Sequence, residues 1–80
     1  MELQEFVEQM RDLFEDTNPD EINAETHFQE LDEWSSLTAL SIIAMVKTEY
    51  ERNITGKEIR ECATVESLFS YIQKLEIVKV

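Results

Sequence analysis

The chain has 80 residues, of which 42% are hydrophobic and 31% are charged. This length supports one small domain with a modest core, so we treat residues 1–80 as a single domain. The formal net charge of −11 excludes ordinary nucleic-acid binding, which requires basic residues to displace counterions from phosphates. There is no apolar segment of membrane-spanning length and no signal-type N-terminus, so we expect a cytoplasmic protein, and we expect it to be a monomer.

The negative charge lies in the first part of the chain. Residues 1–33 contain 12 of the 18 acidic residues and a single base, Arg11. Residues 34–80 contain equal numbers of acids and bases and are neutral as a group. Such an acidic half can act as a solubilising surface or can steer the protein towards basic partner proteins.

The N-terminal segment has the apolar periodicity of an amphipathic helix over about residues 2–15. Its apolar residues are Leu3, Phe6, Val7, Met10, Leu13 and Phe14. Pro19 excludes Asn18 from helical geometry and ends this segment. A long connection follows up to Glu33, and Phe28 and Leu31 within it predict a short turn that is attached to the core. A loop of this length in so small a domain is expected to pack down or to serve a function.

The central segment predicts a helix over residues 36–51. It has no Gly or Pro, and its apolar residues are Leu37, Ala39, Leu40, Ile42, Ile43, Ala44, Met45 and Val46. Because these residues surround most of the helix, we expect neighbours on several of its sides. Ser35 or Ser36 is expected to cap the first turn, where free N–H groups and the helix dipole also favour a phosphate.

Two further helices are predicted, over residues 56–61 and 64–75. Thr55 and Glu58 fit a capping box for the first of them, and Thr64 is expected to cap the second. Residues 76–80 show no periodic pattern. The fold class is therefore all-α, a small four-helix bundle of three long helices and one short helix with a long first loop. The expected core is Leu3, Phe6, Leu13, Phe28, Leu40, Ile43, Ile59, Leu68 and Ile72.

The chain has few of the groups that enzymes use. Its one histidine, His27, has no ligand partner at helical spacing, so no metal site is expected. Its one cysteine, Cys62, is expected to be a small buried apolar residue. There is no glycine-rich phosphate loop and no Ser/His/Asp set, so we expect that the chain alone catalyses nothing.

Several residues together resemble the pattern of acyl carrier proteins. That family has a Phe and a Leu ahead of an Asp-Ser-Leu triplet that starts a long helix. An aromatic residue ends this helix, an isoleucine follows, and Thr-Val starts the last helix. The corresponding residues here, within a match over about residues 3–75, are Phe28, Leu31, Ser36, Leu37, Tyr50, Ile54, Thr64, Val65, Tyr71 and Ile72. The resemblance implies a four-helix bundle of the acyl-carrier type.

The resemblance also implies a covalent cofactor. Ser36 corresponds to the serine that receives 4′-phosphopantetheine from coenzyme A, in a reaction catalysed by a separate phosphopantetheinyl transferase. The thiol of the arm would then carry an acyl or aminoacyl group as a thioester. It would present this group to loading and transferring enzymes, as in lipid or polyketide biosynthesis. The resemblance does not specify the cargo.

The sequence departs from the family pattern at the docking positions. Ser35 replaces the aspartate of the triplet, and Thr38, Ser41 and Lys47 occupy positions that are usually acidic. Enzymes of standard fatty-acid synthesis place basic patches against those acids, so we expect a specialised stand-alone carrier with other partners.

These departures lead to a prediction about the docking residues. We expect partners to contact Leu37 and the apolar start of the central helix, with charge supplied by Glu30, Asp32 and Glu33. The alternative is that these three acids are only solvated.

Two other functions can be compared with the residues, and one of them remains open. The chain can be an unmodified carrier-like helical interaction module, in which the serines only cap a helix. A hydrolase that uses Ser36 is disfavoured, because the sequence places no base near that serine.

Overall fold

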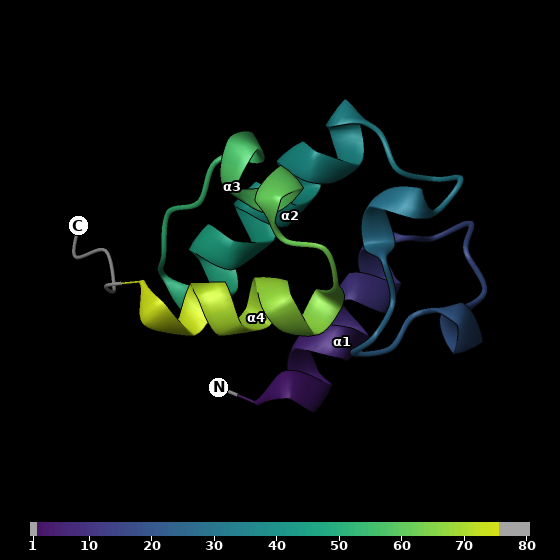
Figure 1. Ribbon diagram of the computed structural model, residues 1–80, viewed down its shortest axis with the longest axis horizontal. Coiled ribbons are helices and arrows are strands. Elements are labelled where there is room, and N and C mark those ends of the chain that lie inside the picture. The colour runs from purple at the N-terminus through teal and green to yellow at the C-terminus, as the bar shows by residue number, and fades with distance from the viewer. Residues whose placement is uncertain (1, 76–80) are drawn as a thin grey trace.

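The computed structural model describes residues 2–75, and within them it contains four α-helices, two short 3-10 helices and no strand. This confirms the predicted small all-helical bundle, although it does not bear on the family. The predicted helix ends differ from the observed ends by at most two residues. Residues 76–80, for which no periodic pattern was found in the sequence, lie outside the described residues. The elements are α1 (Leu3–Leu13), η1 (Pro19–Glu21), η2 (Phe28–Glu30), α2 (Ser36–Tyr50), α3 (Gly56–Glu61) and α4 (Val65–Lys74) (Figure 1).

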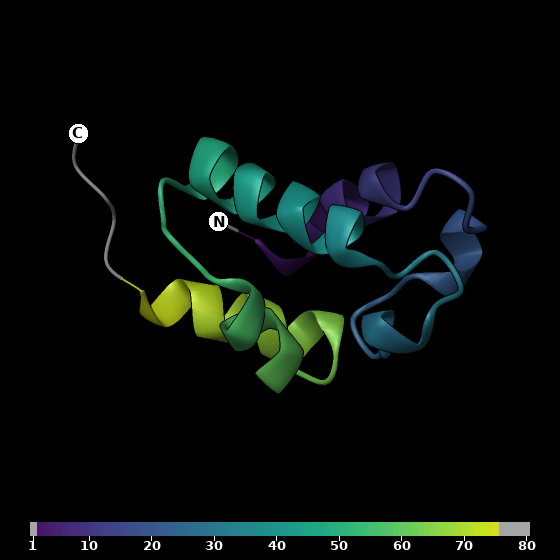
Figure 2. The same ribbon diagram turned by 90° about the horizontal axis from the view of Figure 1, so that it is seen from above.

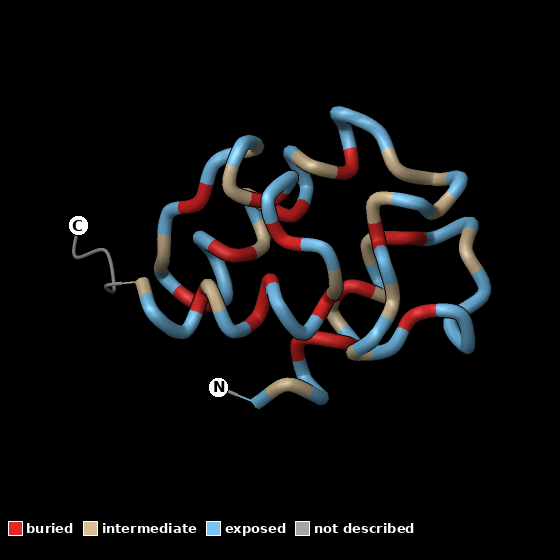
Figure 3. The backbone as a smooth tube through the Cα atoms, viewed as in Figure 1, coloured by how far each residue is buried: buried red, intermediate tan, exposed pale blue. Residues whose placement is uncertain are grey.

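The helices pack around one core. α1 contacts both α2 and α4, and α3 packs against α2. Figure 2 shows α2 along one side of the molecule and α4 along the other, with the long first loop at one end. The radius of gyration is 11.6 Å, close to the value of about 12 Å expected for a compact domain of this size. The largest fully buried side chains include Phe6, Met10, Phe14, Ile22, Phe28, Ile42, Ile59, Leu68 and Ile72 (Figure 3).

Of the nine predicted core residues, five are fully buried, three are partly buried and one is exposed. Leu3, Leu13 and Ile43 are partly buried against the core. Leu40 is 60% exposed, so its assignment to the core was wrong. The fully buried members of the predicted set are Phe6, Phe28, Ile59, Leu68 and Ile72.

The reason for the error at Leu40 lies in the environment of α2. Its buried residues, Thr38, Ile42, Val46 and Tyr50, recur every four positions and form a single stripe. The expectation of neighbours on several sides holds in part, because α1 and α3 both pack against α2 and because Ile43 and Met45 are partly buried beside the stripe. An 80-residue chain has too few helices to cover the remaining face as well. Leu40 belongs to the opposite face, which faces solvent.

The long first loop packs against the bundle as expected. Its carbonyl groups at Ala24 and Thr26 accept hydrogen bonds from the backbone N–H groups of Glu66 (2.9 Å) and Val65 (3.1 Å) at the start of α4. The side-chain amide of Gln29 donates to carbonyl groups at the end of α3, at 2.8 to 3.2 Å. These bonds hold the loop and thereby position the residues that lead into α2.

The helix caps differ in part from the prediction. The Thr55 hydroxyl accepts a hydrogen bond from the Glu58 N–H at 3.3 Å, but the Glu58 carboxylate does not return to the Thr55 backbone, so only half of the predicted capping box forms. That carboxylate instead accepts a hydrogen bond from the Tyr71 hydroxyl, which raises the pKa of Tyr71. At α4, Thr64 caps the helix as predicted, and a full capping box with Ser67 forms.

Candidate functional site

The two serines at the start of α2 have different roles in the structure. Ser35 is the N-cap residue, with extended backbone angles, and its Oγ accepts a hydrogen bond from the Thr38 N–H at 3.4 Å. The Thr38 hydroxyl lies 3.3 Å from the same oxygen and donates to the carbonyl of Glu33 at 2.9 Å. Ser35 is therefore occupied by the local structure of the helix start.

Ser36 is the first residue of α2 and is exposed. Its hydroxyl has no hydrogen-bond partner among residues 2–75, so it is accessible to another molecule. The first turn of α2 contains no acidic residue. The free N–H groups and the dipole of the helix therefore produce a local field at Ser36 that favours a negative group.

The residue that follows Ser36 is unusually exposed for its type. Leu37 is 76% exposed, and Leu37 and Leu40 are the two exposed large hydrophobic side chains among the described residues. They lie three positions apart, on the face of α2 that no other helix covers. An exposed nucleophilic hydroxyl thus stands beside an exposed apolar surface.

The loop acids that we predicted as docking residues differ in their surroundings. Glu30 is exposed and pairs with His27, with 3.5 Å between Oε2 and Nδ1. Asp32 is also exposed. Glu33 is partly buried, and its Oε1 accepts hydrogen bonds from the Thr17 hydroxyl at 2.8 Å and from the Asp16 N–H at 3.0 Å. Glu33 therefore joins the two ends of the long loop, in addition to any role in docking.

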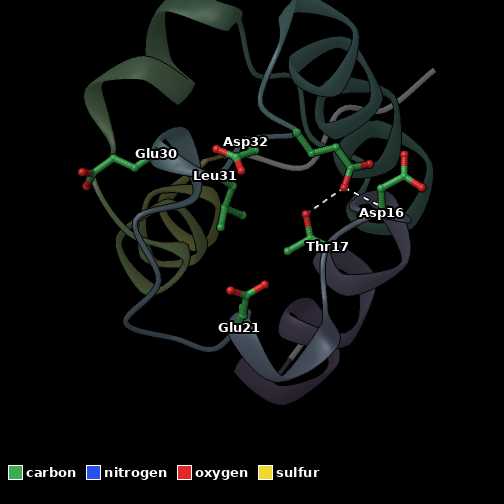
Figure 4. Close-up of a pocket in the computed structure, with 7 residues that line it drawn as sticks. Asp16, Thr17, Glu21, Glu30, Leu31 and Asp32 are labelled. Carbon is green, nitrogen blue, oxygen red and sulfur yellow. Dashed lines mark hydrogen bonds between the residues drawn. The ribbon is translucent and has the colours of Figure 1, made fainter.

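These acids line an open cleft of about 470 Å³ (Figure 4). The dashed lines in Figure 4 mark the two hydrogen bonds that Glu33, at one side of the cleft, accepts from Thr17 and from the backbone of Asp16. The cleft is lined by Asp16, Thr17, Glu21, Glu30, Leu31, Asp32 and Glu33. No group of three or more potential metal ligands in residues 2–75 has the arrangement that a metal ion would need.

A second groove separates the end of α1 from the start of α2. It has a volume of about 370 Å³ and lies directly beside the candidate serine, since it is lined by Ser35 and Leu37. Its remaining lining residues are Asp12, Leu13, Glu15, Glu33, Thr38 and Ser41. Asp12 and Glu15 were not predicted as site residues, although acids at the predicted C-terminal end of a helix could have marked them.

The other reactive side chain lies away from this region. Cys62 is buried, which confirms the prediction of a small core residue. Burial, together with the nearby carboxylates of Glu61 and Glu58, raises the pKa of its thiol. A neutral, buried thiol is a poor nucleophile.

No helix within residues 2–75 combines the length and apolar character required to cross a membrane.

Comparisons with known proteins do not assign the chain to a family. No family model, curated protein or solved structure matches the chain.

Proposed function

We propose that this chain is a carrier protein of the acyl-carrier type that holds a 4′-phosphopantetheine arm on Ser36. The observation that carries the proposal is the difference between the two serines. The Ser35 oxygen caps α2, whereas the Ser36 hydroxyl is exposed, has no hydrogen bond within residues 2–75 and adjoins the exposed Leu37. The order of residues that resembles acyl carrier proteins selects the same serine.

The proposed modification is a phosphoryl transfer. The Ser36 Oγ attacks the phosphorus of coenzyme A that bears the pantetheine group. The phosphoanhydride bond breaks, the adenosine bisphosphate part of coenzyme A leaves, and the hydroxyl proton passes to a base of the transferase. The product is a phosphodiester with a terminal thiol, and that thiol holds the acyl or aminoacyl cargo as a thioester.

The start of α2 suits a phosphodiester in two ways. Four backbone N–H groups of a helix start have no partner within the helix, and the dipole favours negative charge there. In addition, the residue before Ser36 is the neutral Ser35 instead of an aspartate, and the first turn has no acid, so nearby repulsion of the phosphate is small.

The proposal includes the partners of the carrier. A transferase and the loading and transferring enzymes would meet the protein at Leu37, with Glu30, Asp32 and Glu33 as candidate charged contacts. As proposed, the carrier is not an enzyme and acts as a cytoplasmic monomer that binds its enzymes in turn.

The test is a mass measurement. The purified protein is incubated with coenzyme A and a broad-specificity phosphopantetheinyl transferase, and its intact mass is recorded. We expect a gain of one phosphopantetheinyl group in the natural protein and in Ser35→Ala, and none in Ser36→Ala. Absence of any gain in the natural protein, with a known carrier modified in the same assay, would overturn the proposal in favour of an unmodified helical interaction module.

A further inference from the structure

The groove between α1 and α2 contains acidic residues in an electrostatically unfavourable position. Asp12 lies in the last turn of α1 and Glu15 lies just beyond its end. The C-terminal end of a helix carries a partial negative charge, so an acid in the last turn is repelled by it. Arg11, the one basic residue of this turn, is oriented elsewhere, because its Nε donates to the carbonyl of Ile22 at 2.9 Å.

No cation within the described part of the chain neutralises these acids. The one contact between a carboxylate and a basic side chain found in residues 2–75 joins Glu30 and His27. Lys47 is the nearest base along α2, but it follows Ser41 by six positions, which is about 9 Å along the helix axis. The acids of the groove thus weaken the fold without a compensating contact, and local violations of this kind are expected at functional surfaces.

The acids adjoin an uncovered apolar surface. Leu37 lines the groove itself, and Leu40 continues the exposed apolar face one turn further along α2. Leu13 adds a partly buried apolar side chain between the two acids. Exposed apolar surface that is bordered by charge is typical of protein–protein docking sites. A second copy of this chain does not fit, because each copy has a formal net charge of −11.

We infer that the groove between α1 and α2 is the charged half of the docking surface. A partner enzyme would place an apolar side chain on Leu37 and Leu40, and a lysine or arginine of the same partner would enter the groove between Asp12 and Glu15. Asp12 and Glu15 of α1 would thus supply the negative charge that Thr38, Ser41 and Lys47 of α2 do not supply. This inference rests on the proposed function, because its partner is the enzyme that modifies Ser36.

The test compares two pairs of charge-neutralising substitutions in the same helix. Asp12→Asn with Glu15→Gln changes the groove, and Glu5→Gln with Glu8→Gln changes two acids nearer the start of α1. The rate of phosphopantetheine transfer, expressed as kcat/KM, is measured at low and at moderate salt. We expect the groove pair to lower kcat/KM about threefold to tenfold at low salt, with a smaller loss at moderate salt. The control pair should stay within about twofold.

A stability measurement separates docking from damage to the fold. Removal of the unfavourable charges at the end of α1 should raise the melting temperature of the groove pair. A lower melting temperature together with slower transfer would therefore oppose the inference, whereas a higher melting temperature with slower transfer would support it.

The outcomes distinguish the two proposals. If the natural protein is modified at Ser36 but both pairs lose activity equally, or neither loses any, the groove inference fails and the proposed function stands. If the natural protein is not modified, the proposed function fails and the inference falls with it. Sedimentation that shows a dimer lost in Leu37→Ala would instead assign the apolar face to self-association and overturn the inference.

Discussion

The two adjacent serines illustrate how a shift of one residue along the backbone separates a structural hydroxyl from an accessible one. Ser35 precedes the helix in extended geometry, so its Oγ can reach back to the Thr38 N–H. Ser36 already has helical geometry and cannot make the same bond. The same residue type therefore has two different environments in neighbouring positions.

This difference predicts that the two serines contribute unequally to stability. Ser35→Ala should lower the free energy of unfolding by about 0.5–2 kcal/mol, because an N-cap oxygen is lost. Ser36→Ala should stay within about 0.5 kcal/mol of the natural protein. Urea denaturation measures both values. Ser35→Asp supplies a capping oxygen again and should recover the lost stability, and equal losses in the two alanine variants would contradict the assignment of the cap.

Tyr50 and Tyr71 affect how the free energy of unfolding depends on pH in the alkaline range. Burial, followed by the charges of Glu5 and Glu49, raises the pKa of Tyr50. The hydrogen bond to Glu58 is the main cause of the raised pKa of Tyr71. A group with a raised pKa in the folded state stabilises the fold fully below its unfolded pKa of about 10 and loses this contribution as the pH rises through the folded pKa.

We therefore expect the unfolding free energy to fall from about pH 10 upward. The Tyr50 hydroxyl donates to the side-chain oxygen of Gln9, and the Tyr71 hydroxyl donates to Glu58. The double variant Tyr50→Phe/Tyr71→Phe should be less stable near neutral pH, because both hydrogen bonds are lost, but its stability should decline less steeply above about pH 10. Urea titrations at several alkaline pH values measure the slopes. Parallel slopes for the two proteins would exclude the tyrosines as the cause.

At the scale of elements, α2 has a buried stripe and an exposed apolar face on the same helix. Ile42 is fully buried in the stripe, whereas Leu40, two positions earlier, is 60% exposed. Both are large aliphatic residues on a continuous helix, so intrinsic helix propensity does not distinguish them strongly. Their different surroundings are a property of the packing.

A matched pair of substitutions in α2 tests this arrangement. Ile42→Ala should cost about 2–5 kcal/mol of unfolding free energy, because it leaves a cavity among buried side chains. Leu40→Ala should change it by less than about 0.5 kcal/mol, because the side chain is largely in solvent. Chemical denaturation of both variants gives the comparison, and a large loss at Leu40 would mean that this face is covered.

At the scale of the whole molecule, the dominant feature is unbalanced negative charge. All of the formal net charge of −11 arises from residues 1–33, which form α1 and the long loop. The loop is nevertheless held against α3 and α4 by hydrogen bonds, so its acids are held close together. Folding therefore concentrates like charges that the unfolded chain would separate.

Added salt should accordingly stabilise the protein. The screening length falls from about 10 Å at 0.1 M to about 3 Å at 1 M ionic strength, so repulsion between these exposed acids weakens as salt is added. We expect a melting temperature that rises with sodium chloride, and an equal effect of potassium chloride, because screening depends on ionic strength. A melting temperature that falls with salt would show that attractive ion pairs dominate.

The sequence by itself determined the elements of this protein. Helical periodicity of the apolar residues located α1 and α4. The capping residues Thr55 and Thr64 identified the starts of α3 and α4, because a cap joins residues only three positions apart and can be recognised in a short stretch of sequence. The predicted end of α2 was one residue too late. The helix ends at Tyr50 because Glu51 adopts a left-handed conformation (φ 56°), which is usually found at glycine. The leucine that follows Ser36 also led to the prediction of Ser36 as the modified residue, which stays a prediction.

Only the tertiary structure decided which surfaces the elements expose. A helix that is apolar on most sides contains no sequence signal for the side that will be buried, so the exposure of Leu37 and Leu40 followed from where α1, α3 and α4 pack. Glu33 accepts hydrogen bonds from Thr17 and from the backbone of Asp16, which lie far from it in the sequence. Asp12 and Leu37 likewise line one groove although they are distant in the sequence. Local patterns do not record such contacts, because packing alone determines which distant segments meet.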